Sequence, residues 1–176
     1  GFYYSTWAHE GQKGRYALTQ FEPTSARRAY PGWDEPAYKA NFTFRMLHRV
    51  NTTALANMPS AYERSVDKEQ VRQLLQTRSS GLSLHQYNLD EWLLTEFETT
   101  PKMATYLVAW ANGAFLHVSN TTISPLTGRV IPLRMYTTPD LIHQAAFSTE
   151  VMAKILPEYE KVFDIAYPLP KLDALV

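Results

Sequence analysis

The residues best suited to chemistry gather in one segment, TQFEPTSARRAYPGWDEPAYKANF, which runs from Thr19 to Phe42. It holds three carboxylic acids and a pair of arginines: Glu22, Asp34, Glu35, Arg27 and Arg28. Adjacent side chains of an extended segment point to opposite sides, so Asp34 and Glu35 are not expected to form a catalytic dyad. The prolines at 31 and 36 instead predict a turn around this acidic pair, braced by Arg27 or Arg28.

Other kinds of catalytic site have weaker support. The five histidines lie far apart, and His9-Glu10 is followed by Lys13 where a zinc motif H-E-x-x-H needs histidine. There are no cysteines, which excludes disulfides, thiolate metal sites and a cysteine nucleophile. Glu96 and Glu98 share a face of a predicted strand, which leaves a glycosidase with paired carboxylates as a distant alternative.

Composition narrows the class of protein further. Lys plus Arg and Asp plus Glu both number 17, so the chain lacks the basic surplus typical of nucleic-acid binders. The longest apolar run, Tyr106 to Leu116, is too short to span a membrane. Three Asn-x-Thr sequons, at Asn41, Asn51 and Asn120, favour a secreted or extracellular location. A cytoplasmic location is the alternative.

Alternating apolar and polar residues predict β-structure over the first three quarters of the chain. Residues 1–8 and 15–23 suggest a hairpin with a longer loop over His9–Gly14. Further strands are predicted in NFTFRMLHRV, TTALANMP, LLTEFETT, TYLVAWANGAFLHVSN and RVIPLRMYTT. Between the second and third of these lies an insertion at about 60–90, in which Val66, Val71, Leu74 and Leu75 allow a short amphipathic helix and RSSGLS predicts a loop.

The last forty residues change to a helical pattern. Thr138 is the expected N-cap and Pro139 the first helical residue, and Pro157 is expected to kink or split the helix because it removes a hydrogen bond to the Ala153 carbonyl. A strand is expected to start near the end of the chain with no partner to pair with, which suggests that the fold continues beyond Val176. The change from strands to helix predicts a domain boundary near residue 136.

The segment TQFEPTSARRAYPGWDEPAYKANFTF resembles a signature of the zinc aminopeptidases of the aminopeptidase N type, a gluzincin family. In that family T-Q-F-E-P-T leads into A-R-x-x-F-P-C-F-D-E-P-x-x-K-A-x-F. The segments NMP, FETTPKMATYLVAWANGAF and the stretch from IPLRMYTT to the end resemble later family segments in the same order. Gly32, Trp33 and Pro157 depart from the family pattern and indicate a divergent member.

The resemblance implies a mainly β fold: a partial, saddle-like β-sandwich domain over residues 1–136, then the first helix of a thermolysin-like α/β catalytic domain over 137–176, truncated. It also implies an internal fragment, because the family's zinc motif and exopeptidase loop would follow Val176. By position, Glu22 would bind the free α-amino group of a peptide substrate and Gln20 would contact the same substrate.

The resemblance also implies that Zn²⁺ is bound by residues outside this chain, so that the remainder of the catalytic domain is a partner and the chain alone is inactive. A non-catalytic β-rich module, derived from such an enzyme and binding carbohydrate or a protein, is the alternative.

Overall fold

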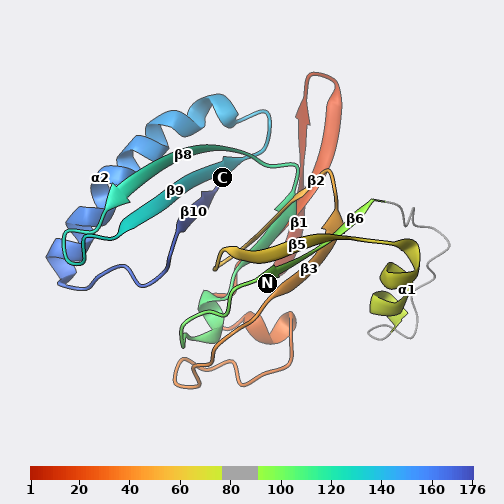
Figure 1. Ribbon diagram of the computed structural model, residues 1–176, viewed down its shortest axis with the longest axis horizontal. Coiled ribbons are helices and arrows are strands. Elements are labelled where there is room, and N and C mark those ends of the chain that lie inside the picture. The colour runs from red at the N-terminus through yellow and green to blue at the C-terminus, as the bar shows by residue number, and fades with distance from the viewer. Residues whose placement is uncertain (77–90) are drawn as a thin grey trace.

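The computed structural model describes residues 1–76 and 91–176. Strands dominate it, and a long helix lies near the C-terminus, which confirms the mainly β class (Figure 1). The elements are β1 (Phe2–His9), β2 (Gln12–Thr19), β3 (Arg45–Arg49), β4 (Thr53–Ala56), β5 (Ser60–Val66), α1 (Lys68–Gln76), β6 (Trp92–Phe97), β7 (Trp110–Gly113), β8 (Leu116–Ile123), β9 (Val130–Thr137), α2 (Ala145–Phe163) and β10 (Leu172–Leu175). Short 3₁₀ helices are η1 (Ala26–Arg28), η3 (Thr105–Leu107) and η4 (Ile142–Gln144).

The strands form three sheets. One is antiparallel with the order β1-β2-β7-β4, the second is antiparallel with the order β3-β6-β5, and the third has the order β10-β9-β8. In Figure 1, α2 lies along the third sheet at one end of the molecule and α1 lies at the other end. The first sheet carries the segment of interest, because that segment begins where β2 ends.

The β1–β2 hairpin differs from the predicted one. Its loop has two residues, Glu10 and Gly11, and not the longer loop expected over His9–Gly14. Both residues have positive φ, 48° and 78°, which is the backbone of a type I′ turn and matches the twist of the paired strands. The pairing therefore continues from Phe2↔Thr19 to His9↔Gln12, and the hairpin stands out from the rest of the molecule (Figure 1).

The predicted insertion at about 60–90 starts with a strand of a sheet. Ser60–Val66 is β5 and pairs with β6. The expected amphipathic helix is α1, and Val71 on its inner face is fully buried against Val66 and Leu94. Asp67 caps this helix, because its Oδ1 accepts the Gln70 N–H at 2.8 Å. The predicted loop RSSGLS lies outside the described residues.

The C-terminal region also departs from expectation. Thr138 does not cap α2: its carbonyl accepts the Leu141 N–H in a tight turn, η4 follows, and α2 begins at Ala145. The last strand is not unpaired either, because β10 pairs in parallel with β9, from Leu172↔Leu133 to Leu175↔Tyr136. The order β9-α2-β10 is thus a βαβ unit, in which a helix connects two parallel strands.

Pro157 lies inside α2 but does not split it. Proline has no N–H, so the carbonyl of Ala153 has no donor within the helix. The hydroxyl of Thr122, a buried residue of β8, donates to that carbonyl at 2.8 Å. A side chain of the sheet therefore replaces the hydrogen bond that proline removes, and this contact also fixes α2 on β8.

We expect Thr122→Val to destabilise the protein by about 1–2 kcal/mol, because the carbonyl of the half-buried Ala153 would then lose its donor. Urea denaturation measures the loss, and exposed Thr121→Val is the matched control. In a Pro157→Ala background the helix regains its own N–H donor, so the effect of Thr122→Val should shrink. An unchanged effect in that background would contradict this explanation of the contact.

Candidate substrate-binding site

Gln20 and Glu22 follow directly after β2, on either side of Phe21. Phe21 is buried, with 1% of its surface exposed, while Gln20 and Glu22 are both exposed. Phe21 packs edge-on against Trp110, with ring centroids 5.1 Å apart, and against Tyr30. One buried anchor therefore lies between the two predicted substrate-binding side chains.

Backbone contacts hold this tripeptide from the β2 side. Gln20 N–H donates to the Gly1 carbonyl at 2.9 Å, and the Gly1 nitrogen donates to the Gln20 carbonyl, which extends the β1–β2 pairing by one residue. The hydroxyl of Thr19 accepts the Trp110 N–H of β7 at 3.0 Å. Gln20 Oε1 accepts the Glu22 N–H at 3.3 Å. The Gln20 amide thus uses its oxygen within the segment and keeps its N–H donors for another group.

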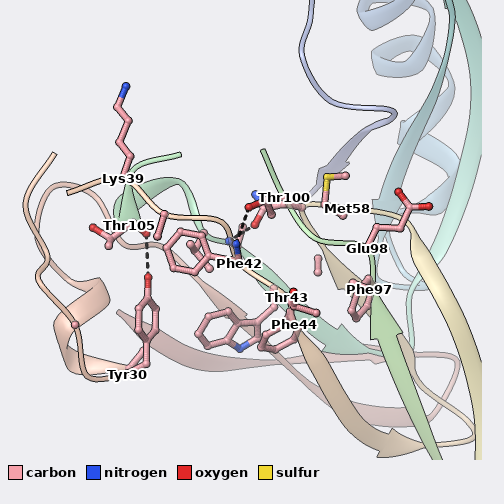
Figure 2. Close-up of a pocket in the computed structure, with 18 of the residues that line it drawn as sticks. Tyr30, Lys39, Phe42, Thr43, Phe44, Met58, Phe97, Glu98, Thr100 and Thr105 are labelled. Carbon is pink, nitrogen blue, oxygen red and sulfur yellow. Dashed lines mark hydrogen bonds between the residues drawn. The ribbon is translucent and has the colours of Figure 1, made fainter. Parts of the chain in front are cut away.

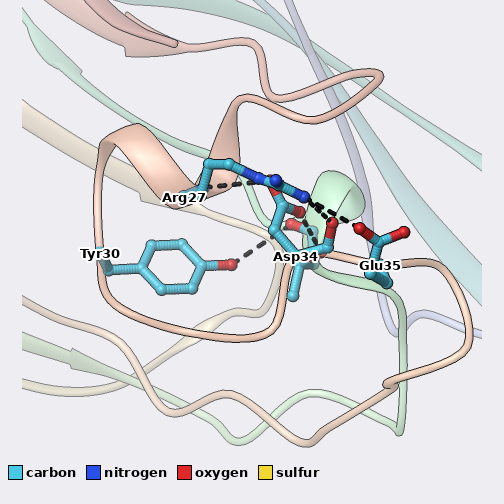
Figure 3. A network of polar contacts seen from close by, with 5 residues as sticks. Arg27, Tyr30, Asp34 and Glu35 are labelled. Carbon is cyan, nitrogen blue, oxygen red and sulfur yellow. Dashed lines mark hydrogen bonds and ion pairs between the residues drawn. The ribbon is translucent and has the colours of Figure 1, made fainter.

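A polar network holds the far side of the segment, as Figure 3 shows. Asp34 Oδ2 accepts the backbone N–H of Arg27 at 3.0 Å and its Nε–H at 3.4 Å. A terminal N–H of Arg27 donates to the Asp34 carbonyl at 2.6 Å and to Glu35 Oε1 at 3.2 Å. Asp34 Oδ1 accepts the Thr105 hydroxyl at 2.5 Å. The predicted brace is confirmed, and Arg27 is the arginine that makes it.

Asp34 and Glu35 do not point apart as an extended segment would require. The chain bends here, since the Glu35 carbonyl accepts the Tyr38 N–H at 3.0 Å, and both carboxylates contact Arg27. The Thr105 hydroxyl and the Arg27 donors hold the pKa of the buried Asp34 below its usual value. Burial, and then the negative charge of Asp34, raise the pKa of the Tyr30 phenol.

Asp34 should make the fold sensitive to acid. Its pKa is lowered in the folded state, so its contribution is complete above the unfolded value of 3.8 and is lost as pH falls through the folded pKa. We expect the difference in unfolding free energy between the wild type and Asp34→Asn to be constant from about pH 7 to pH 5 and to shrink towards pH 3. Urea denaturation across this range measures it, and a difference that does not change with pH would contradict the expectation.

A cavity of about 650 Å³ lies beyond the Asp34 network, and Gln20 and Glu22 are not among its lining residues. Its walls are largely apolar and include several aromatic side chains, and Figure 2 shows the rings of Tyr30, Phe42 and Phe44 together there. Trp33 lies at its edge with 79% of its surface exposed. Lys39 extends away from the rings in Figure 2, so the cavity is an apolar hollow with few charged groups facing inward.

Glu96, one of the two acids of the glycosidase alternative, has a structural role. Glu96 accepts the Tyr62 hydroxyl at 3.2 Å and forms an ion pair with Arg45, so neighbouring strands hold its carboxylate.

Among residues 1–76 and 91–176, no three His, Cys, Asp or Glu side chains are placed to hold a metal ion. The described part of the chain therefore forms no zinc site of its own.

The sequons differ in accessibility. Asn51 is exposed in the turn that joins β3 to β4. The Asn41 side-chain N–H group, the position where a glycan would attach, donates to the Thr100 carbonyl at 2.7 Å, and Asn120 is half-buried on β8. Asn51 is thus the best-placed glycan attachment site of the three.

In the part of the chain that the structure describes, no helix has the length and apolarity needed to cross a membrane.

Comparison with known proteins defines the class of this β-rich chain. Residues 1–80, which include β1, β2 and the segment with Gln20 and Glu22, match the Peptidase M1 N-terminal domain. The similarity to named aminopeptidases extends over almost the whole chain. The endoplasmic reticulum aminopeptidase 2 of Bos taurus is 38% identical over 98% of this chain and 15% of its own length.

Two further relatives are also named aminopeptidases and are similar over almost the whole chain. The glutamyl aminopeptidase of Bos taurus is 33% identical over 99% of this chain and 16% of its own length, and aminopeptidase M1 of Arabidopsis thaliana is 35% identical over 99% and 17%. The chain belongs to the M1 aminopeptidase family. It spans 15–17% of the length of these relatives.

Proposed function

We propose that this chain is part of a zinc-dependent aminopeptidase that hydrolyses N-terminal residues from peptides, and that Glu22 binds the substrate's α-ammonium group. The observation that carries the proposal is the placement of Glu22. Its side chain is exposed while Phe21 beside it is 1% exposed, so the backbone that carries the carboxylate is fixed. The aminopeptidase names of the relatives support the reaction class.

A fixed carboxylate suits an exopeptidase. A carboxylate and an ammonium form a charge-assisted hydrogen bond, which is roughly twice as strong as a neutral one. A substrate with a blocked or internal amine cannot make this contact, so the carboxylate favours peptides with a free N-terminus. Glu22 would bind and orient the substrate without taking part in bond cleavage.

Gln20 is proposed to contact the same substrate in its first subsite. Its Oε1 already accepts the Glu22 N–H at 3.3 Å. Its amide N–H groups therefore remain to donate to a carbonyl oxygen of the first substrate residue. This arrangement would make Gln20 a second contact, weaker than that of Glu22 because neither partner carries a full charge.

The remaining parts of the proposal concern the rest of the enzyme. Zn²⁺ would be held, and water activated, by residues outside this chain, so residues 1–176 alone should have no peptidase activity. The division into an N-terminal domain (1–136) and the start of a catalytic domain (137–176) stays a proposal. The pairing of β9 with β10 crosses that boundary, so the two parts would share a sheet.

Glu22→Gln in the full-length protein tests the central role. Removing the charge should lower kcat/KM for a free dipeptide amide about 10- to 100-fold, since a charged hydrogen bond contributes about 1.5–3 kcal/mol. Glu98→Gln is the matched control, because Glu98 is exposed and lies outside the Gln20–Glu22 segment. If kcat/KM of Glu22→Gln equalled that of the control, Glu22 would not be the amine-binding residue.

The sequence also left open a non-catalytic binding module, and the aromatic cavity with exposed Trp33 is the observation that favours it. Activity of the full-length protein separates the two functions. Hydrolysis of free-amine peptides that depends on Glu22 supports the peptidase. Absence of any hydrolysis, together with binding of a carbohydrate or protein that Trp33→Ala abolishes, would support the module.

A further inference from the structure

We propose that Asp34 is a positioning residue for Glu22: its buried carboxylate holds η1, and η1 in turn fixes the loop that presents Glu22 to the substrate amine. This inference rests on the proposed function of Glu22. It assigns to Asp34 a role in substrate binding although Asp34 itself does not touch the substrate.

Asp34 is buried, and its carboxylate oxygens already accept hydrogen bonds from within the protein. It is 5% exposed, and its two carboxylate oxygens accept hydrogen bonds from Thr105 and from Arg27. Such a group is not available to a substrate. It joins η1, its own loop and η3, and its contact with Thr105 alone crosses 71 residues of sequence.

A short loop connects Glu22 to η1. Three residues, Pro23 to Ser25, separate Glu22 from the start of η1. The Ser25 N–H donates to the Phe21 carbonyl at 2.7 Å, so the loop closes on the residue that anchors Glu22. Ala26 is fully buried in the same cluster as Phe21. A displacement of η1 would therefore move the backbone of Glu22.

Asp34 also holds Arg27 in place through hydrogen bonds to its backbone and its side chain. The Arg27 backbone N–H belongs to the first turn of η1, where backbone donors have no partner within the helix. Asp34 Oδ2 accepts this N–H at 3.0 Å and so caps η1 from a distant loop. Tyr30, just after η1, donates its hydroxyl to the Thr105 carbonyl at 3.4 Å, as Figure 2 shows. The turn is thus held at both ends by one network.

A purely structural role would give a different result from a positioning role. If Asp34 only stabilised the fold, its loss would reduce activity by the same factor whether or not Glu22 were present. If Asp34 acts through Glu22, its loss should have little effect once the Glu22 charge is gone. A double-mutant cycle on kcat/KM separates the two.

The test uses the full-length protein with Asp34→Asn, Glu22→Gln and the double variant, assayed on a free dipeptide amide. We expect Asp34→Asn alone to lower kcat/KM about 10-fold, mainly through KM, and to cause less than about a 2-fold further loss in the Glu22→Gln background. Equal losses in both backgrounds, or no loss in the wild-type background, would overturn the inference.

Additional variants keep the test decisive. If Asp34→Asn does not fold, Thr105→Val removes only the Oδ1 contact and should show the same coupling to Glu22, whereas Thr105→Ser keeps the hydroxyl and should restore KM. Glu96→Gln, a carboxylate paired with Arg45 in another sheet, is the control and should leave kcat/KM within about 2-fold of the wild type. A Thr105→Val loss that is independent of Glu22 would overturn the inference.

The failure of this inference is distinguishable from the failure of the proposed function. If Glu22→Gln alone has wild-type kcat/KM, the proposed amine-binding role is wrong and the positioning role falls with it. If Glu22→Gln is impaired while Asp34→Asn and Thr105→Val are not, only the positioning role is wrong.

Discussion

Phe21→Ala is expected to lower the free energy of unfolding by about 3–5 kcal/mol, because the substitution leaves a cavity among Tyr30, Val108 and Trp110. It should also raise KM for free-amine substrates in the full-length protein, since Phe21 is the anchor between Gln20 and Glu22. Urea denaturation followed by tryptophan fluorescence measures the first effect, and steady-state kinetics measures the second.

Phe21→Leu provides the comparison, because leucine fills part of the same volume and should cost only about 1–2 kcal/mol. The two effects of Phe21→Ala should therefore both be reduced in the leucine variant. If Phe21→Ala and Phe21→Leu were equally stable, or if Phe21→Ala left KM unchanged, Phe21 would not anchor the segment as we propose.

Lys171→Met is the second substitution with a large expected effect. Lys171 is 6% exposed, donates to the Ala56 carbonyl of β4 at 2.8 Å and forms an ion pair with Asp173 of β10. Removing the ammonium leaves the Asp173 carboxylate buried, with Arg134 at 3.7 Å as a remaining cation. We expect a loss of about 3–5 kcal/mol in stability, the usual cost of breaking a buried ion pair.

The double variant Lys171→Met with Asp173→Asn should recover part of this loss, because no unpaired carboxylate then remains. Hydrogen exchange of the β4 and β10 amides in the full-length protein is the appropriate measurement, since it reports on both strands that Lys171 connects. Exposed Lys102→Met is the control. A double variant less stable than Lys171→Met would contradict this explanation.

Local patterns predicted much of the fold. Alternation of apolar residues predicted strands where β1, β3, β4 and β6–β9 lie, and periodicity predicted α1 and α2. A brace by Arg27 or Arg28 was also predicted, because prolines and an acidic pair close to two arginines favour a turn of this kind, and the structure identifies Arg27. These features depend on residues within a few positions of one another.

Features that depend on distant residues were not predictable. The contact of Asp34 with Thr105 crosses 71 residues, and that of Lys171 with Ala56 crosses 115. The Thr122 hydroxyl compensates for Pro157 from another element, so Pro157 by itself suggested a kinked or split helix. Similarly, Thr138 and Pro139 have the residue types of a helix start, but the turn to Leu141 and η4 delays the helix to Ala145.

The tight hairpin was missed for a different reason. The usual signal for a two-residue loop of this type is Asn-Gly or Asp-Gly, and here Glu10 occupies the first position with φ of 48°. Likewise, Ser60–Val66 was assigned to an insertion because its mostly exposed residues lack an apolar face, although its backbone pairs with β6. Backbone pairing, and not side-chain pattern, makes these residues strands.

A structure of the full-length protein with a bound free amino acid or short peptide would test the amine-binding role of Glu22 most directly. The measurement is the distance from the ligand's α-nitrogen to the Glu22 carboxylate. We predict a contact of about 2.7–2.9 Å, the usual length of a charge-assisted N–H···O bond. An α-nitrogen bound by other residues, with the Glu22 carboxylate turned away to solvent, would contradict the account.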